Sequence, residues 1–293
     1  MPDETGVRAA FPGGPSPTDT ETRIIMTTPA PRQPVIFIPH GGGPCFFMDW
    51  PKTWDRMAEH LRGIPQRLPA RPKAILVVSG HWETAMPTVT TGTRPPLIFD
   101  YYGFPPHTYE LRYPAPCSPE LAARVRELLG QAGIESAGDD ARGFDHGVFI
   151  PFLLAFPEAE IPVVELSVRD DLDPAEHLAL GRALAPLRDE GVLIVATGMT
   201  YHNLRHFMRP DGVNDEVSVV FDDWLGEAVT AAPAQRDRLL LGWEQAPGAR
   251  ACHPREEHLI PLLFAAGAAG EDIGQRDYHD RVMGKALSGF RFG

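Results

Sequence analysis

Short runs of consecutive apolar residues alternate with stretches of helical periodicity along most of the chain after residue 33. Four runs are rich in Val, Ile and Leu and lie at residues 35–38, 74–79, 162–168 and 192–197. Continuous apolar runs of this length are typical of strands covered on both faces. The pattern therefore predicts an α/β fold: a single domain over residues 34–293, with a central, largely parallel or mixed sheet flanked by helices.

Two amphipathic segments are expected to form helices of the scaffold. The first opens at Ser118 and Pro119 and ends near Gly130, with Leu121, Val125, Leu128 and Leu129 on one face. The second carries apolar side chains at three- and four-residue spacing, at Val217, Val220, Phe221, Trp224 and Leu225. No internal repeat is present, and Gly41 to Gly43 do not have the spacing of a phosphate-binding loop.

The first 33 residues differ from the rest of the chain. They are rich in Pro, Thr, Gly and Asp and have no apolar periodicity, so residues 1–33 are expected to be a disordered extension. Met26 stands just before the periodic part and is a candidate alternative start of translation.

Charge and composition exclude several classes of partner. The formal net charge is -12 and no local run of Lys or Arg offsets it, which argues against binding to nucleic acid or anionic lipid. No apolar run approaches the roughly 20 residues of a membrane span. Three scattered cysteines, Cys45, Cys117 and Cys252, favour a reducing compartment, the cytoplasm. A homodimer is compatible with the sequence, although no feature identifies an interface.

Histidines follow three of the predicted strands. His40 comes after the first strand and leads into three glycines, His81 follows the second, and His202 lies just past the fourth. In open α/β sheets the ligand crevice forms at the carboxyl ends of the strands, so these imidazoles could converge there. For any one of them alone, a hydrogen bond to a loop carbonyl is the more common role.

His258 and His146 are two further candidates. Pro254 is expected to start a helix with Glu257 and His258 in its early turns, and Pro261 is expected to open that helix slightly. Neutral imidazoles, with or without a carboxylate, suit Fe(II) or Zn(II). His146 follows Asp145, which could orient its ring for proton transfer.

The remaining histidines and several other side chains have simpler interpretations. Surface or loop exposure is expected for His60, His107, His177, His206, His253 and His279. Tyr113 could contact an aromatic substrate or be packing. No G-x-S-x-G motif supports a serine nucleophile, and small buried thiols explain the cysteines.

Five segments in order resemble the LigB superfamily of class III extradiol dioxygenases, and most closely its 4,5-DOPA dioxygenase branch. They are IPHGGGP, VVSGHWET, GFDHGVFIPF, TYHNL and HPREEHLIPLL, and they contain His40, His81, His146, His202 and His258. The first motif departs from the branch pattern, in which a serine and a small residue are common, and so does the Met-Thr-Tyr that precedes His202. Substrate identity is the property that these changes put in question.

The resemblance implies that residues 34–293 form a catalytic dioxygenase domain acting on an aromatic diol, DOPA or a related catechol, with dioxygen. Fe(II), which Zn(II) can replace during purification, would be bound by His40, His81 and His258. His202 would be a fourth ligand or an acid/base group, Glu257 an alternative ligand, and His146 or His202 the proton carrier. A zinc hydrolase using the same histidines, or a non-catalytic binding protein of this fold, are the alternatives.

Overall fold

The computed structural model describes residue 6, residues 31–207, residue 209 and residues 212–293. The expected disordered extension therefore lies almost entirely outside the described residues, as does Met26. Gln33, the last residue of the expected extension, is buried and makes two hydrogen bonds. Its backbone N–H donates to the Arg188 carbonyl, and its side-chain NH₂ donates to the Ala70 carbonyl. The folded part thus already includes Gln33.

In the part of the chain that the structure describes, one mixed sheet has eight strands in the order β4-β3-β5-β2-β6-β1-β8-β7. The strands are β1 (Val35–Pro39), β2 (Ala74–Thr84), β3 (Thr88–Thr90), β4 (Ala137–Asp139), β5 (Val163–Arg169), β6 (Val192–Gly198), β7 (Gly274–Val282) and β8 (Lys285–Phe292). The four predicted strands correspond to β1, β2, β5 and β6, which pair in parallel at the centre. The predicted α/β fold with a mixed sheet is confirmed.

Helices cover both faces of the sheet. The α-helices are α1 (Asp55–Arg62), α2 (Ile64–Arg67), α3 (Pro119–Gln131), α4 (His146–Ala155), α5 (Pro174–Leu184), α6 (Asp215–Thr230), α7 (Pro233–Leu241), α8 (Ala249–Cys252) and α9 (Ile260–Ala269). Single 3₁₀ turns lie at Cys45–Phe47, Pro106–Tyr109, Ala185–Arg188 and Trp243–Gln245. Both predicted scaffold helices are present, as α3 and α6.

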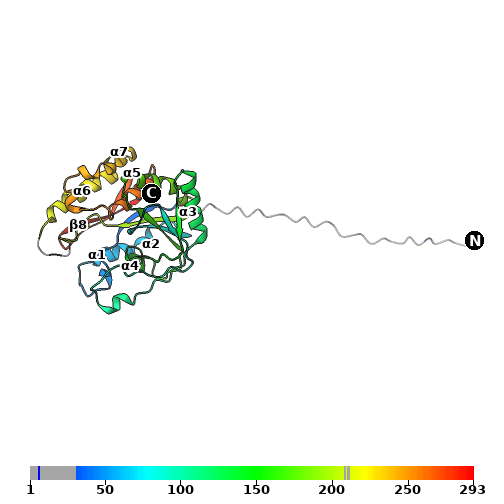
Figure 1. The fold of residues 1–293 in the computed structure, drawn as a ribbon, viewed down its shortest axis with the longest axis horizontal. Coiled ribbons are helices and arrows are strands. Elements are labelled where there is room, and N and C mark those ends of the chain that lie inside the picture. Colours follow the sequence, from blue (N-terminus) through cyan, green and yellow to red (C-terminus); the bar gives the residue numbers. More distant parts are fainter. Residues whose placement is uncertain (1–5, 7–30, 208, 210–211) are drawn as a thin grey trace, which may run out of the picture.

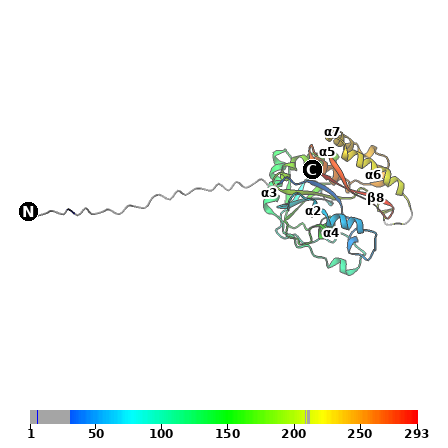
Figure 2. The same ribbon diagram turned by 180° about the vertical axis from the view of Figure 1, so that it is seen from behind.

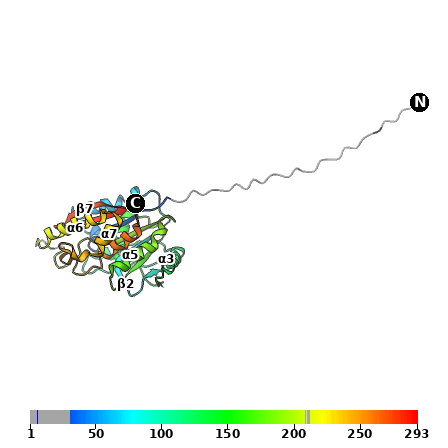
Figure 3. The ribbon, with the colours of Figure 1, turned by 90° about the horizontal axis from the view of Figure 1, so that it is seen from above.

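The helices form two layers on opposite sides of the sheet. Figure 1 shows α5, α6 and α7 on one side and α1, α2 and α4 on the other, and the reverse view in Figure 2 agrees. Seen from above, α6, α7, α5 and α3 follow one another across the first of these layers (Figure 3). Among the described residues, no helix combines the length and the apolar character that crossing a bilayer requires.

Three sequence-based expectations are wrong at the ends of elements. The strand expected to end at Ser79 continues as β2 to Thr84, with a shift of register between Ser79 and Glu83. No helix starts at Pro254, because the chain turns there and α9 begins only at Ile260. Pro261 therefore sits in the first turn of α9, where a missing N–H is tolerated, and does not open the helix.

The six histidines expected at the surface or in loops differ in exposure, and His60 and His206 are only partly exposed. His107 and His279 are exposed. His177 and His253 are fully buried, contrary to expectation. The His177 ring accepts from the Arg169 backbone N–H and lies 2.7 Å from the Asp173 carbonyl, whereas the His253 ring lies 3.0 Å from the Thr200 carbonyl. Both rings form hydrogen bonds with backbone groups. The polar residues that surround them in the sequence do not indicate these bonds.

Close packing of α5 against α9 fixes the helical layer nearest β6. A Cβ built on Gly181 would overlap the carbonyl oxygen of Phe264, so Gly181→Ala is expected to destabilise the fold by roughly 1–3 kcal/mol through overpacking. Gly130→Ala in α3 is the matched control, because a Cβ there meets nothing within 4 Å. It should be neutral or stabilise by roughly 0.4–1 kcal/mol. Urea denaturation of both variants measures the difference, and equal midpoints would contradict the packing argument.

Candidate metal centre

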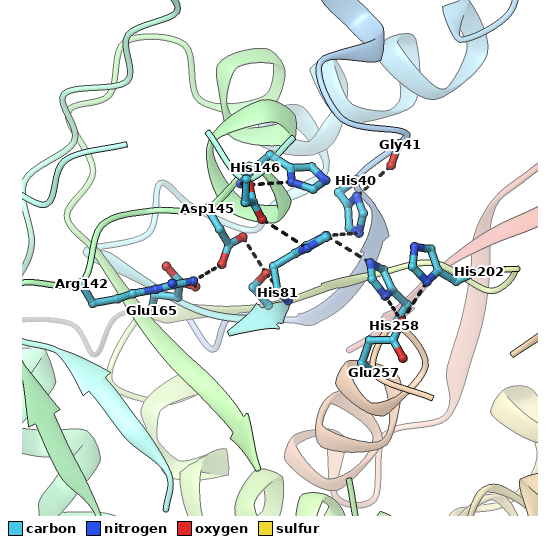
Figure 4. Close-up of polar contacts among 12 residues, drawn as sticks. His40, Gly41, His81, Arg142, Asp145, His146, Glu165, His202, Glu257 and His258 are labelled. Atoms are coloured by element: carbon cyan, nitrogen blue, oxygen red, sulfur yellow. Dashed lines mark hydrogen bonds and ion pairs between the residues drawn. The ribbon is translucent and has the colours of Figure 1, made fainter. Parts of the chain in front are cut away.

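Three imidazoles from distant parts of the chain meet at the carboxyl edge of the central strands. His40 follows β1, His81 lies near the end of β2, and His258 lies in the turn before α9. The Nε2 atom of His81 is 3.3 Å from that of His40 and 3.1 Å from that of His258 (Figure 4). These three residues form a group whose ligand atoms all lie within 4.8 Å of one another.

Neighbouring strands explain why the three rings converge. Strand β6 lies between β1 and β2, so the chain ends leaving β1 and β2 are close together. The turn carrying His258 is bonded to the end of β6, because the Met199 backbone N–H donates to the His258 carbonyl at 3.0 Å. Gly198 makes this approach feasible, since a Cβ at that position would overlap the same carbonyl oxygen.

The Nδ1 atom of each ring faces an acceptor. His40 Nδ1 lies 2.8 Å from the Gly41 carbonyl, His81 Nδ1 3.3 Å from Asp100 Oδ2, and His258 Nδ1 2.9 Å from Glu257 Oε1. Carbonyl and ionised carboxylate oxygens only accept, so the proton of each neutral ring sits on Nδ1. The three Nε2 atoms then present lone pairs to one another and cannot hydrogen-bond among themselves.

This donor arrangement fits a metal ion. Three Nε2 lone pairs that face each other without a shared proton repel unless a cation lies between them, and imidazole nitrogen is a favoured ligand of Fe(II) and Zn(II). Burial lowers the pKa of His40 and His258 well below the usual range, and nearby imidazoles add to the effect. Burial, and next the His146 charge, lower the pKa of His81 to about 4. All three rings are therefore neutral, as ligands must be, at physiological pH.

His146 lies beside this group at the start of α4. Its ring centre is 4.0 Å from that of His81 and 5.2 Å from that of His40. The ring is oriented by Asp100, whose Oδ1 is 2.7 Å from His146 Nδ1 and also accepts the His146 backbone N–H at 3.0 Å. The expectation that Asp145 orients His146 is wrong, since Asp145 accepts from Ser79 and Arg142.

Asp100 is a site residue that sequence reasoning missed. It lies in the loop between β3 and α3, without a neighbouring histidine or strand to mark it. Burial alone would raise the pKa of Asp100, but the hydrogen bond and charge of His146 outweigh burial and lower the pKa to about 2. The ionised carboxylate thus binds the Nδ1 side of two rings at once, those of His81 and His146.

Replacement of Asp100 by Asn should weaken both rings' orientation. An amide has a single oxygen acceptor, so one of the two Nδ1–H groups would face the amide NH₂. We expect metal affinity to fall by roughly 10–100-fold, as is usual for a residue that orients a ligand from outside the coordination sphere. Competition with a chromophoric chelator measures it. Asp140→Asn, an exposed aspartate outside the site, is the matched control, and equal affinities of the two variants would contradict the orienting role.

His202 and Glu257 form a second edge of the site. The His202 and His258 rings stack with centres 3.3 Å apart and planes 19° apart, and both Nδ1 atoms lie 2.9 Å from Glu257 Oε1. Burial would raise the pKa of Glu257, but the hydrogen bond from His202 outweighs it and lowers the pKa. Glu257 therefore approaches the Nδ1 side of His258, opposite the Nε2 that faces His81 (Figure 4).

A buried polar network lies behind His81. Asp145 accepts from Ser79 Oγ at 2.8 Å and from Arg142 at 2.7 Å, and the Ser79 Oγ in turn accepts the His81 backbone N–H. Arg142 also lies 3.6 Å from the buried Glu165. Burial, and next the Asp145 charge, raise the pKa of Glu165 well above its usual range. This network fixes the irregular end of β2 from which His81 projects (Figure 4).

A cleft of about 500 Å³ opens over the histidines. All five histidines singled out in the sequence line it, together with Asp100 and several aromatic and apolar side chains. Tyr113 does not: it is buried and packs against Phe152. The cleft is large enough for a single-ring aromatic compound, and its inner end carries the imidazoles.

Comparisons with known proteins identify the family. Residues 34–290 match the family described as the catalytic LigB subunit of aromatic ring-opening dioxygenase. The chain is 40% identical over 256 residues to a 4,5-DOPA dioxygenase extradiol of Beta vulgaris, covering 86% of this chain and 93% of that protein. It is 39% identical over 281 residues to Dioxygenase tasH of Hapsidospora irregularis, covering 89% and 85%.

A relative and a solved structure from Escherichia coli are also similar to this chain. A 4,5-DOPA dioxygenase extradiol of Escherichia coli K12 is 36% identical over 248 residues, covering 84% of this chain and 88% of that protein. The crystal structure of an uncharacterized protein from Escherichia coli K12 superposes with a TM-score of 0.73 at 30% identity, covering 89% of this chain and all of the other. This chain therefore belongs to the LigB family of aromatic ring-opening dioxygenases and is an oxidoreductase of the extradiol class.

Proposed function

We propose that this enzyme binds one Fe(II) through the Nε2 atoms of His40, His81 and His258 and opens the ring of a catechol beside its two hydroxyls. The observation that carries the proposal is the convergence of three neutral imidazoles whose protons are all held on the far side by acceptors. The rings of His40 and His258 are buried and that of His81 is partly buried. Three protein ligands leave positions for a diol and for dioxygen. When bound, the ion supplies Lewis acidity toward the diol oxygens and a redox-active centre for dioxygen.

His146 is the proposed proton acceptor. Its Nδ1–H is held by Asp100, so its Nε2 lone pair is available on the cleft side. A diol placed over the three ligand rings would bring a hydroxyl within reach of this nitrogen, because the His146 ring stands 4.0 Å from the His81 ring. The Asp100 carboxylate also stabilises the imidazolium that forms when His146 takes the proton.

His202 is the proposed second acid/base group, at the opposite side of the ligand rings. It stacks on His258 and shares the Glu257 oxygen, so its Nδ1–H is held and its Nε2 faces the same side as that of His258. Glu257 is proposed to orient both rings and not to bind the metal. The group of His202, Glu257 and His258 could itself hold an ion, and so could the group of His81, Asp100 and His146. These are the alternative arrangements to be tested.

The proposed compartment rests on the state of the cysteines. Cys45, Cys117 and Cys252 are all buried and unpaired among the described residues, which supports a reducing compartment such as the cytoplasm.

A zinc hydrolase using the same ligands is the rival function, since imidazoles also bind Zn(II). The dioxygenase relatives do not favour it.

Dioxygen consumption tests the proposal. Protein purified without oxygen is loaded with Fe(II) or with Zn(II) and offered unsubstituted catechol, DOPA and protocatechuate, while oxygen and visible absorbance are recorded together. We expect uptake of dioxygen and a coloured semialdehyde only with Fe(II), because Zn(II) has no redox chemistry. Absence of uptake by fully loaded Fe(II) protein across the panel would contradict ring cleavage, and hydrolysis by the Zn(II) form would favour the rival.

A further inference from the structure

The outer end of the cleft is apolar, in contrast to its inner end. Four side chains line it, and together they are called the apolar rim: Tyr102, Phe104, Leu204 and Phe207. Tyr102 and Leu204 are 91% and 65% exposed, among the most exposed large apolar side chains of the described residues. Exposed apolar side chains gathered at the mouth of a cleft are typical of a ligand contact.

Part of the apolar rim is fixed by packing before any ligand arrives. The Phe104 ring lies against Gly43, where an added Cβ would be 3.2 Å from the ring, and it packs edge-on against Tyr101 with centres 5.5 Å apart. Phe207 is buried and packs against Trp54 at 6.2 Å. These contacts hold one wall of the cleft directly beside the turn that carries His40.

The charge of the cleft argues against an anionic substituent on the substrate. Among the described residues that line it there is no Lys or Arg, and its one acidic residue, Asp100, is engaged by two histidines. A carboxylate transferred from water into this cleft would lose hydration without gaining a cationic partner. Arg205 and Arg209 lie in the same segment as Leu204 and Phe207, but neither lines the cleft.

We propose that the apolar rim binds an uncharged, apolar substituent on the ring of the diol, so that the preferred substrates are alkyl- or aryl-substituted catechols and not catechols bearing a carboxylate. This rests on the proposed function, because the diol end must occupy the inner, histidine-lined end of the cleft. The substituent then points outward between Tyr102 and Leu204, where its burial removes apolar surface of both partners from water.

A matched pair of substrates tests the proposal. 4-Propylcatechol and 3-(3,4-dihydroxyphenyl)propionate have the same three-carbon chain, and only the second ends in a carboxylate. We expect kcat/KM of the Fe(II) enzyme to be at least about tenfold higher for 4-propylcatechol. Equal or higher kcat/KM for the carboxylate would overturn the inference while leaving ring cleavage intact. If neither compound nor unsubstituted catechol is cleaved, the proposed function fails and the inference fails with it.

Substitutions test whether the apolar rim causes the preference for 4-propylcatechol. Leu204→Ala should lower kcat/KM for 4-propylcatechol by about tenfold, and much more than for unsubstituted catechol. Leu241→Ala is the matched control, an exposed leucine on α7 outside the cleft, and should not change the ratio. Arg205→Ala and Arg209→Ala test the competing idea of a cation in this segment. Loss of turnover of the carboxylate compound in either variant, with turnover of 4-propylcatechol kept, would overturn the proposal.

Equilibrium binding supplies a readout independent of turnover. Titration calorimetry of the two compounds into Zn(II)-loaded protein, which cannot carry out the redox step, should give the tighter dissociation constant for 4-propylcatechol. The preference should be lost in Leu204→Ala and kept in Leu241→Ala. Equal affinity for the two compounds in the unaltered protein would contradict the role of the apolar rim.

Discussion

Replacing His81 with alanine is expected to abolish stoichiometric metal binding and, with it, all dioxygen uptake. His81 Nε2 is the central atom of the group, lying within 3.3 Å of the Nε2 atoms of both His40 and His258. Its loss leaves two ligands that no longer define a face of the coordination sphere. The affinity should fall by more than the roughly 10–100-fold expected when an orienting residue outside the coordination sphere is removed.

Metal content by mass spectrometry and thermal unfolding check this result together. A ligand that binds only the native state stabilises it, by about 4.1 kcal/mol at a concentration 1,000 times its dissociation constant. We expect Fe(II) or Zn(II) to raise the melting temperature of the unaltered protein and to leave that of His81→Ala unchanged. His107→Ala is the matched control, an exposed histidine that does not line the cleft. Full metal content in His81→Ala would refute the assigned ligand set.

Replacing His146 with alanine is expected to separate metal binding from catalysis. The variant should retain one metal per chain, because His146 is hydrogen-bonded to Asp100 and is not one of the three proposed ligands His40, His81 and His258. Turnover should fall by roughly 10²–10⁴-fold, the usual contribution of a positioned acid/base group. A merely structural role would lower activity at every pH alike, whereas loss of a proton acceptor should remove one limb of the pH profile of kcat/KM.

His146→Gln provides the accompanying control. Glutamine can keep a hydrogen bond near Asp100 but cannot take up a proton, so it should restore stability and not turnover. Wild-type turnover in either variant would exclude His146 as the proton acceptor and would leave His202 as the remaining candidate. Loss of metal from both variants would instead place His146 among the ligands, beside Asp100 and His81.

The central strands and most of the site could be predicted because their signals are local. Val35 to Ile38 and Val192 to Thr197 are uninterrupted apolar runs, and His40 and His202 follow them within a few residues. A strand buried on both faces has to emerge at the edge of the sheet, where its next polar side chain is exposed to the crevice. The fold class therefore predicted that the strand ends carrying His40 and His202 lie at the same edge of the sheet. It did not predict the distances between the imidazoles.

What could not be predicted depends on contacts between distant segments. Asp100 is 46 residues from His146 and carries no periodic signal. Strand β7, which pairs antiparallel with β8, was not predicted because most of its residues are polar, and Gln275, His279 and Arg281 are exposed. Residues 253–259 form no helix despite the helix signal at Pro254, and the Met199 backbone N–H bonds the His258 carbonyl, a tertiary contact that no local signal indicates.

The position of the iron tests the proposed ligand set of His40, His81 and His258 directly. Crystals loaded with Fe(II) under anaerobic conditions, with diffraction recorded on both sides of the iron absorption edge, locate the ion by its anomalous signal. We expect one peak per chain, bounded by the Nε2 atoms of His40, His81 and His258, with Glu257 on the far side of His258. A peak within the group of His202, Glu257 and His258, or no ordered iron at the three Nε2 atoms, would contradict the proposed ligand set.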